Sequence, residues 1–518
     1  PRQQMYIQRL YLYLNMTKPS EQLYLSYAKI GNDGHSLRPA YLIDLVKKMY
    51  PLLHVEAPEN DSIEEQLVCG ADGIGMLADM LREYAGGRLS EELRGRMYTL
   101  YHSYHRKTQY QDTVDRLIDA AFYRYSDTPL SKMVTRALYG RMLLNSVSRL
   151  EKYAACAYGH FLQYGLALRE RGDYSFEDVD MGNVFHGVLE LFAQRLSANG
   201  YTWFDFPEKE ARRMIEEAVE AYAAEYEETI LYSSARNRHL LGRMTRILTR
   251  TVLTLQTQLK KGSFVPEQFE MSFSMIEDLD ALNIALNEQD KMRLRGRIDR
   301  VDTCEAEDKV YVKVIDYKSG TRKFDLAALY YGLQLQLVVY MNAAVEMEQK
   351  RHPDKKIVPA AMLYYHIDDP MVEDGDTLTP EQINDKLLQE LRMTGLVNES
   401  DEAVRLLDAE FTDKSQVLPI ERKKDGSFSA YSSVISEEDM QAVSDYVNQK
   451  IKQIGSGILD GTISVNPYEQ GANQACTYCA YRNVCGYDSR VEGYEMRRLP
   501  KLSADDALCK MREELGGK

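Results

Sequence analysis

Two aspartates and a lysine lie where a β-hairpin would bring them together. Residues 310–318 are rich in β-branched and aromatic side chains, which is typical of a strand, and residues 294–301 have a similar character. The polar residues between these runs predict a turn that places Asp299 directly opposite Asp316, with Lys318 on the same face. Opposed carboxylates repel each other unless a cation lies between them, and hard ions such as Mg²⁺ or Mn²⁺ prefer oxygen ligands. The hairpin therefore predicts a metal site.

A solvated hairpin whose acids align by coincidence is the alternative interpretation. A register shift of one residue would move Asp299 to the opposite face of the strand. Asp316 lies on an otherwise apolar face of its strand, where aspartates are less common than on a polar face. Its position there favours the metal site.

Two helical patterns carry further polar pairs. His186 and Glu190 are four residues apart in the helix predicted at 182–196, and Gln336 and Tyr340 are four apart after the hairpin. Each pair is common in surface helices. Beside the hairpin, His186 could act as a metal ligand or an acid–base group, and the other pair could position a phosphate or the attacking water.

Three cysteines near the C-terminus have the spacing of a metal centre. Cys476, Cys479 and Cys485 follow the pattern C-x₂-C-x₅-C, and Cys156 is the best fourth donor elsewhere. Such a set could hold zinc or an iron–sulfur cluster, and the spacing does not decide between them. Either would close a long loop and so contribute to folding. The other cysteines are expected to be ordinary thiols: Cys69, Cys304 and Cys509.

The composition describes an acidic chain with one basic segment. Its 518 residues carry a net charge of −15, and the length suits two to four domains. A start without methionine suggests a piece of a longer protein, and seven cysteines without a secretory or membrane segment suggest the cytoplasm. One predicted helical face is basic although the chain as a whole is acidic: Arg236, His239, Arg243, Arg246 and Arg250. This face could bind a phosphate backbone, or it could be an ordinary solvated surface.

The periodicity predicts an α/β fold in which helices flank a short mixed sheet. Strand-like patterns occupy 264–320 and 357–366. Neither of the glycine-rich loops that cradle nucleotide phosphates occurs, so ATP hydrolysis is not expected here. Residues 1 to about 140 are predicted to be mostly helical after an opening strand-like piece. Further helical patterns occupy 147–169, 182–196, 207–262, 326–346, 380–410 and 436–458.

Several of these motifs, taken in order, carry a family resemblance. The chain resembles the C-terminal half of the AddB subunits of bacterial AddAB helicase–nucleases, which carry a RecB-type PD-(D/E)XK nuclease domain. The resemblance covers most of the chain and rests on the three closing cysteines and these segments: 153–158 (YAACAY), 182–190 (GNVFHGVLE), 296–302 (GRIDRVD), 315–320 (IDYKSG) and 334–340 (QLQLVVY).

The resemblance implies a restriction-endonuclease-like core and a role for each motif. Asp299 and Asp316 would bind the catalytic Mg²⁺ with His186 and the backbone carbonyl of Tyr317, while Lys318 would orient or deprotonate the attacking water. The helix motif of this nuclease branch would be supplied by Gln336 and Tyr340. A [4Fe–4S] cluster would be bound by the remaining matches: Cys156, Cys476, Cys479 and Cys485.

The first part of the chain resembles the end of a UvrD-like helicase module. Residues 9–19 lie where motor helicases carry a tyrosine-rich strand ending in Thr-Arg-Ala, and here Lys18 and Pro19 replace the last two residues. That departure suits a helicase fold that serves as a scaffold or DNA reader. The expected domains are an inactive helicase remnant, a nuclease domain with a helical insertion at about 205–262, and a tail: 1–145, 146–490 and 491–518.

These expectations amount to a Mg²⁺-dependent exonuclease that degrades single-stranded DNA from 5′ to 3′ during recombinational repair of double-strand breaks. An AddA-like helicase–nuclease subunit would supply the motor as a heterodimeric partner. The alternative is a non-catalytic DNA-binding or assembly subunit that keeps the nuclease fold as a scaffold. A Cas4-like nuclease shares the cysteine pattern but lacks a helicase-like region of this kind.

Overall fold

A computed structural model describes most of the chain, in two compact units that divide between Tyr123 and Arg124. The division falls before the predicted domain boundary at residue 145. Within the described part of the chain, no helix is both long enough and apolar enough to cross a membrane. The described residues are 2–31, 36–55, 67, 69–171, 176, 178–226, 231–232, 234–273, 279–320, 323–372 and 378–516.

The first unit is helical. Three helices pack on one another around a small apolar core: α4 (Gly70–Ala85), α5 (Glu91–His105) and α6 (Thr108–Ala121). Two further helices, α1 (Arg2–Met16) and α2 (Tyr41–Met49), contribute no residue to that core. The core is formed by Leu77, Met80, Leu81, Leu89, Met97, Tyr104 and Val114.

The strand expected within residues 9–19 is not present, and that prediction is wrong. Most of the segment lies in α1, and Thr17 closes the helix by donating its backbone N–H to the Tyr13 carbonyl at 3.0 Å. A strand needs a neighbour to satisfy its N–H and C=O groups, whereas a helix satisfies them internally. Among the described residues of this unit, the only β pairing is an isolated bridge between Ile30 and Ser36.

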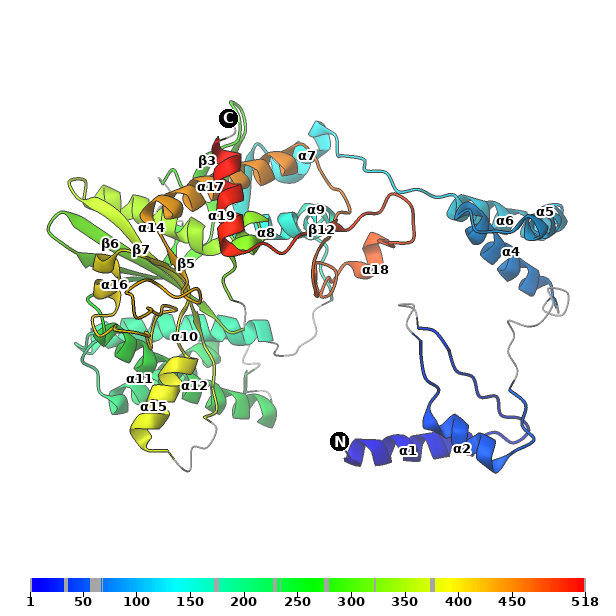
Figure 1. Ribbon diagram of the computed structural model, residues 1–518, viewed down its shortest axis with the longest axis horizontal. Helices are drawn as coiled ribbons and strands as arrows, with labels where there is room; N and C mark the ends of the chain where they lie inside the picture. The colour runs from blue at the N-terminus through cyan, green and yellow to red at the C-terminus, as the bar shows by residue number, and fades with distance from the viewer. Residues whose placement is uncertain are drawn as a thin grey trace. The chain divides into compact units, whose positions relative to one another are not determined.

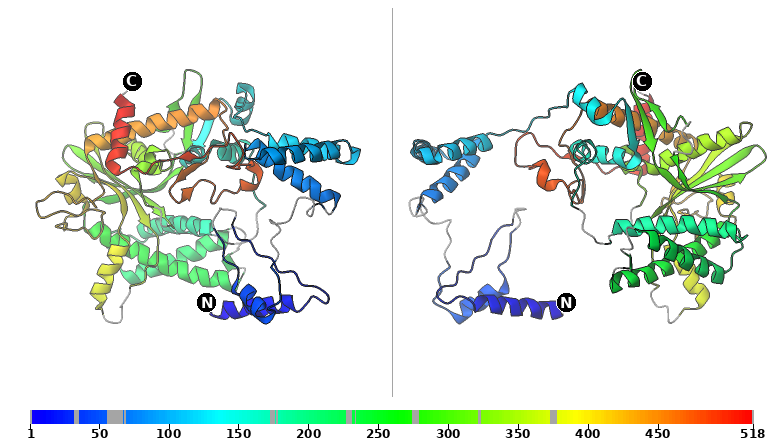
Figure 2. Two further views of the ribbon diagram at one scale, coloured as in Figure 1. Left: turned by 45° about the vertical axis from the view of Figure 1, so that its right-hand side comes forward. Right: turned by 180° about the vertical axis from the view of Figure 1, so that it is seen from behind.

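The second unit is built on a six-stranded mixed sheet whose strand order is β2-β5-β6-β7-β8-β9. β5 and β6 form the antiparallel hairpin, while β6 and β7 run parallel. Helices cover both faces of the sheet, as the two views of Figure 2 and the labels of Figure 1 show. The strands are β2 (Val265–Ser272), β5 (Arg297–Glu305), β6 (Lys309–Lys318), β7 (Lys356–His366), β8 (Thr394–Asn398) and β9 (Val434–Ile435).

The two faces of the sheet belong to different cores. On one face, α10 (Asp178–Ala198), α11 (Glu208–Glu225) and α12 (Ala235–Lys260) bury apolar side chains against Tyr311 and Ile315 of β6. On the other face, helices pack against the alternate residues of β6: α8 (Val147–Ala155), α14 (Gln336–Arg351), α17 (Glu437–Leu459) and α19 (Ala504–Gly516). This three-layer architecture is the predicted α/β fold with a mixed sheet.

Shorter elements complete the unit. Two small sheets have the strand orders β1-β4-β3 and β11-β10-β12. The remaining helices are α7 (Lys132–Tyr139), α9 (Ala157–His160), a π-helical turn (Phe161–Gly165), α13 (Leu326–Tyr330), α15 (Pro380–Glu390), α16 (Asp401–Leu407) and α18 (Arg482–Cys485). The remaining strands are β1 (Met142–Ser146), β3 (Asn283–Ala285), β4 (Lys291–Arg295), β10 (Tyr468–Gln470), β11 (Asn473–Gln474) and β12 (Arg497–Arg498).

The hairpin register agrees with the sequence prediction. Arg300 pairs with Ile315 and Val301 with Val314, so the next pair in the same register is Asp299 with Asp316. The turn closes where expected, because the Ala306 N–H donates to the Lys309 carbonyl at 2.8 Å. The helical patterns around the hairpin also appear, with breaks that divide several of them into two helices.

Two C-terminal segments differ from the expectation. The pattern at 380–410 contains the strand β8 between two helices, so the prediction of helix is wrong there. β8 lies inside the sheet between β7 and β9, and its strand state therefore depends on pairing with distant residues. The segment expected as a tail contains α19, whose Ala507 and Met511 are fully buried in the second core.

Replacing Gly395 of β8 by alanine is expected to destabilise this unit by roughly 3 kcal/mol, because both strain and crowding act there. Gly395 has a φ of +141°, and an added Cβ would lie 2.1 Å from the Met362 carbonyl oxygen of β7. The matched control is Gly426→Ala, where φ is +85° and no atom lies within 4 Å of the added Cβ. Chemical denaturation measures both, and equal losses would contradict the crowding argument.

Candidate active site

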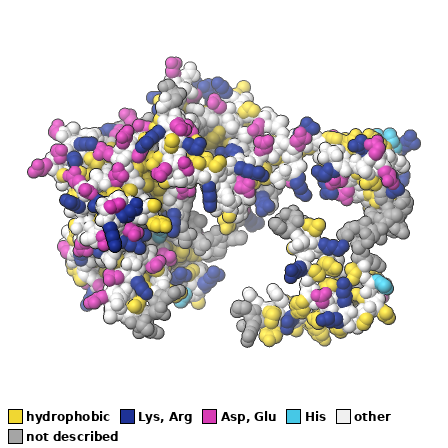
Figure 3. All heavy atoms as spheres, in the orientation of Figure 1, with side chains coloured by type: hydrophobic (Ala, Val, Ile, Leu, Met, Phe, Trp, Pro, Cys, Tyr) yellow, Lys and Arg dark blue, Asp and Glu magenta, His cyan; other side chains and the backbone are white. Residues whose placement is uncertain are grey.

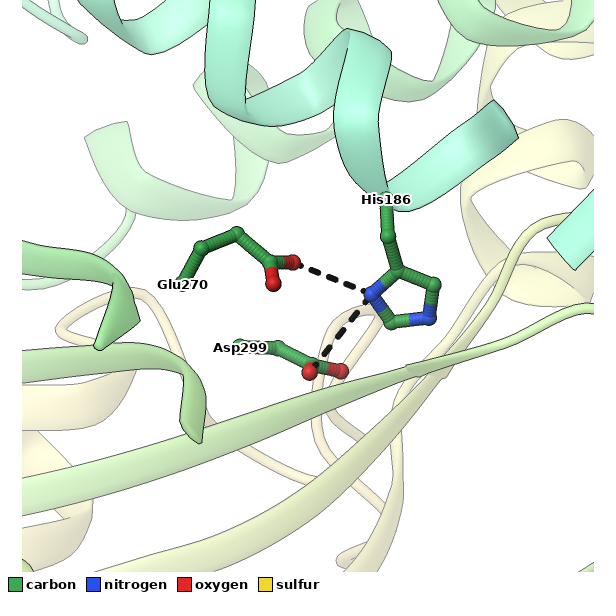
Figure 4. A group of neighbouring side chains, drawn as sticks. All are labelled: His186, Glu270 and Asp299. Carbon is green, nitrogen blue, oxygen red and sulfur yellow. Dashed lines mark hydrogen bonds and ion pairs between the residues drawn. The ribbon is translucent and has the colours of Figure 1, made fainter. Parts of the chain in front are cut away.

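Four ionisable side chains converge at one edge of the large sheet. Asp299 comes from the start of β5, Asp316 from the end of β6, Glu270 from β2 and His186 from the overlying helix α10. Figure 4 shows one ring nitrogen of His186 facing the carboxylates of both Glu270 and Asp299. Its Nδ1 lies 3.1 Å from Glu270 Oε1 and 3.5 Å from Asp299 Oδ1. His186, Glu270 and Asp299 could hold a metal ion together, because their ligand atoms all lie within 4.8 Å of one another. No other group of three or more potential ligands in the described ranges is as compact.

The two aspartates are held by the hairpin and are almost inaccessible to solvent. Asp299 is 6% exposed and Asp316 is 1% exposed. Asp299 Oδ2 accepts a 2.7 Å hydrogen bond from the backbone N–H of Tyr317, which ties the two strands together at the site. Lys318 Nζ lies 2.6 Å from Asp316 Oδ2 as an ion pair, but no hydrogen bond of acceptable geometry reaches that oxygen.

Burial and mutual repulsion perturb these groups strongly. Burial, followed by the charge of Asp316, raises the pKa of Asp299 well above its ordinary value. Burial also raises the pKa of Asp316, although the Lys318 ammonium opposes this. Burial would lower the pKa of His186, but the hydrogen bond with Glu270 and the surrounding carboxylates raise it to about 9. The site therefore concentrates negative charge that attracts a cation.

Lys318 begins a chain of polar contacts that leads to α14. Its Nζ donates to Gln336 Oε1 at 2.8 Å, and Gln336 Nε2 donates to the Tyr340 hydroxyl at 2.8 Å. The Tyr364 ring lies below the same ammonium, 5.4 Å away. Both α14 residues singled out in the sequence are thus brought to the lysine, and they fix its direction toward Asp316.

Glu270 is a site residue that the sequence analysis missed. Its side chain is only 5% exposed and contacts both His186 and Arg297, whose guanidinium lies 3.2 Å from Glu270 Oε2. The backbone at Glu270 has a positive φ of +47°, which is uncommon outside glycine and often marks a functional position. Glu190, the acid one turn from His186, instead lies 3.7 Å from Arg297. The only sign in the sequence that could have pointed to Glu270 is that an acidic residue occurs inside the strand-like run 265–272.

The arrangement matches a known family over most of the second unit. The profile of the PD-(D/E)XK nuclease superfamily matches residues 145–486. The chain belongs to this superfamily.

Curated bacterial proteins named as the B subunit of an ATP-dependent helicase/deoxyribonuclease are similar to the whole chain. The protein of Lachnoclostridium phytofermentans is 39% identical over 528 aligned residues, which cover 100% of this chain and 44% of that protein. Those of Desulforamulus reducens and Bacillus mycoides are each 33% identical, with 100% of this chain and 45% of each protein covered. The chain thus spans less than half the length of these relatives, and the resemblance to AddB subunits is confirmed.

The four cysteines singled out in the sequence line one cavity of the nuclease unit. Cys156 lies between α8 and α9, while the other three lie in the C-terminal segment with β10, β11 and α18. All four are free thiols. In the described ranges no group of four sulfur atoms is as compact as the acidic cluster. The cavity is lined by Cys156, Cys476, Cys479 and Cys485 together with Ala155, Tyr158, Leu162, Val465, Pro467 and Tyr481.

Backbone and arginine contacts hold the two parts of this cavity together. The Tyr487 N–H donates to Cys485 Sγ at 3.4 Å, and backbone N–H groups of Tyr158 and Gly159 are directed at Cys156. The Arg497 guanidinium binds the carbonyl oxygens that end α8 and also donates to the Asn466 carbonyl at 2.8 Å. Burial, followed by the neighbouring thiols, raises the pKa of Cys476 to about 11.

Proposed function

We propose that this chain is the nuclease part of an AddB-type protein and that it cleaves single-stranded DNA with Mg²⁺ or Mn²⁺. The observation that carries the proposal is the group of His186, Glu270 and Asp299, with the buried Asp316 and its partner Lys318 beside it. A scaffold has no need for carboxylates buried against one another. A metal-dependent nuclease needs such carboxylates, because they bind the metal ion.

The donor set fits a hard divalent cation. Asp299 and Asp316 provide carboxylate oxygens, and the buried Asp316 Oδ2, which lies 2.6 Å from the Lys318 ammonium, keeps a further lone pair for a cation. His186 and the backbone carbonyl of Tyr317 complete the proposed ligands, and Glu270 orients the histidine. When bound, the ion lowers the pKa of the attacking water and stabilises charge on the phosphate oxygens.

Lys318 is proposed to act on the same phosphate. Its ammonium is held by Asp316 and Gln336, and Tyr340 holds Gln336 in turn. A fixed cation at this position orients the attacking water, and it offsets the charge that develops on the phosphorus centre. The Gln336 amide oxygen shares the ammonium with Asp316, and the third N–H of Lys318 is proposed to reach the substrate.

The cysteine cavity is proposed to hold a [4Fe–4S] cluster. Four thiols are the donor set of such clusters, and backbone N–H groups are directed at two of these sulfurs, those of Cys156 and Cys485. Zinc is the other metal that Cys₄ sets bind, and it draws all four sulfurs around a single ion. The family resemblance, rather than the positions of the sulfurs, favours the iron–sulfur cluster over zinc.

The first unit is proposed to be an inactive helicase remnant that acts as a scaffold. The sequence contains no nucleotide-phosphate loop, and the similar proteins are named as one subunit of a helicase/deoxyribonuclease. An AddA-like partner would provide ATP-driven unwinding and feed single strands to this nuclease. The complex would act in the cytoplasm during double-strand break repair by homologous recombination.

The proposal is tested by degradation of single-stranded DNA labelled at one end or the other. With Mg²⁺, iron-replete protein should release short labelled products first from the 5′-labelled strand, in keeping with 5′→3′ polarity. EDTA should abolish the reaction. Earlier release from 3′-labelled DNA would reverse the polarity, and the absence of cleavage by iron-replete protein would favour the scaffold alternative.

Glu270→Gln is expected to raise the Mg²⁺ concentration needed for half-maximal cleavage by about 10–100-fold, because the glutamine no longer holds His186 by charge. The measurement is a Mg²⁺ titration of cleavage at saturating DNA. Glu267→Gln, on the same strand but paired with Arg351, is the matched control and should leave the titration unchanged. A shift of equal size in both variants would show a general defect of β2.

A further inference from the structure

The exposed face of α12 is basic, in contrast to the rest of the chain. The helix contains five arginines and one lysine with no acidic residue, whereas the neighbouring α11 contains six glutamates. Acidic and basic side chains are interspersed over much of the face shown in Figure 3. We define the basic stripe of α12 as the residues of one helical face: Arg236, His239, Arg243, Arg246 and Arg250.

The helix retains this charge at a cost to its own stability. Like charges three or four residues apart repel each other, and cations in the first turn oppose the helix dipole. Arg236 and Arg243 are exposed, and among the described residues no carboxylate forms an ion pair with either of them. A solvated helix face has no reason to keep uncompensated repulsion, whereas a polyanion bound to the stripe would compensate it.

The C-terminal end of the stripe lies at the active-site edge of the sheet. Arg246 and Arg250 both bind Asp369, at 2.5 and 2.6 Å. Asp369 comes three residues after His366, which is the register partner of Lys318 on the adjacent parallel strand. Since an extended chain advances at most about 3.4 Å per residue, Asp369 lies within roughly 10 Å of His366. This end of the stripe therefore lies at the same end of the sheet as Lys318.

From that edge the stripe continues toward the N-terminus of α12. Successive basic residues are one turn apart, about 5.4 Å along the axis, so the stripe presents a row of cations at regular intervals. Arg246 remains 61% exposed although it is paired, so an incoming phosphate can replace Asp369 as its partner. A row of arginines that leads to a metal site suits the backbone of an extended single strand.

We propose that the basic stripe of α12 binds the phosphates of the single strand next to the scissile bond and aligns that strand with the active site. The proposal rests on the nuclease function proposed above and adds the surface that holds the substrate. Asp369 acts as a competing anion that keeps Arg246 and Arg250 ordered until DNA displaces it.

Binding of a fluorescein-labelled oligothymidylate to the full chain in EDTA, at several salt concentrations, tests this proposal. Each phosphate contact on single-stranded DNA contributes about 0.7 to the slope of log K against log salt, so Arg236→Gln/Arg243→Gln/Arg246→Gln should lower the slope by about 2. The matched control is Lys356→Gln/Lys452→Gln/Lys510→Gln, which removes equal charge from exposed positions of β7, α17 and α19. The control slope should stay near that of the wild type.

A second variant gives an effect of opposite sign. Asp369→Asn removes the competing anion and should tighten DNA binding severalfold at low salt. Equal slopes for the stripe variant and its control would overturn the proposal and point to an acidic protein surface as the partner. If the wild type binds through the stripe but cleaves no DNA, the nuclease function fails and the stripe stands. If the wild type cleaves DNA and the stripe variant binds DNA normally, the stripe proposal fails and the nuclease function stands.

Discussion

Asp316→Asn is expected to lower Mg²⁺-dependent cleavage of single-stranded DNA at least about 1000-fold, which corresponds to roughly 4 kcal/mol of transition-state stabilisation. Asparagine has nearly the same shape, but it carries no charge with which to hold the metal ion or pair with Lys318. The rate is measured under single-turnover conditions with end-labelled DNA at saturating Mg²⁺. DNA binding in EDTA should change little, because the proposed phosphate contacts are made elsewhere.

The same substitution should not destabilise the metal-free protein. Asp316 is buried beside Asp299 and Glu270, and burial with these like charges raises the pKa values of both aspartates. Asp316→Asn removes one of the repelling charges, so thermal unfolding in EDTA should occur at an unchanged or higher temperature. A gain in stability with a loss of activity is the signature of residues kept for function.

The matched control lies in the same hairpin. Asp308 is exposed at the turn between β5 and β6, and Asp308→Asn should leave both cleavage and unfolding unchanged. Wild-type cleavage rates in Asp316→Asn would place the metal site elsewhere. A marked loss of thermal stability would show instead that Asp316 serves mainly to hold the fold.

The hairpin could be predicted from the sequence because its determinants are local. Alternation fixes which residues face each core, and a short polar turn fixes the register, so the position of Asp299 against Asp316 follows from residues close in sequence. The pairs on α10 and α14 could be singled out by helical spacing, but their approach to the hairpin depends on how the layers pack. Spacing offered only alternative roles for His186, Gln336 and Tyr340, and the family resemblance chose among them.

The features that were missed depend on distant contacts. Glu270 reaches His186 only because β2 pairs with β5 beneath α10, and its strained backbone leaves no mark in the sequence. β8 is a strand because β7 and β9 pair with it on both sides. The basic stripe was visible in the sequence, but the sequence could not place it at the active-site edge. That placement follows from the ion pairs with Asp369.

Loss of the proposed cluster is expected to release the C-terminal cysteine segment from the nuclease unit. Residues 466–498 hold only strands of two or three residues and the four-residue helix α18, so few backbone hydrogen bonds would oppose local unfolding. The apolar support is also small, because the hydrophobic core beside the cavity has three buried members: Phe161, Leu162 and Tyr481. A cross-link between Cys156 and Cys476 would close a long loop and contribute about 3–5 kcal/mol.

Cys476→Ser should therefore lower iron content and the absorbance at about 400 nm, and local unfolding should let trypsin cleave the backbone after Arg482 and Arg490, whose side chains are already exposed. Cys509→Ser is the matched control, because Cys509 is exposed on α19 away from the cavity, and it should retain iron and resist cleavage. Chelation of iron from the wild type should reproduce the tryptic pattern of Cys476→Ser. If the purified protein contains zinc but no iron, the cysteines form a single-ion zinc site and the proposed iron–sulfur cluster is wrong. Trypsin resistance in iron-free protein would show that Arg497 and the apolar contacts hold the segment without metal.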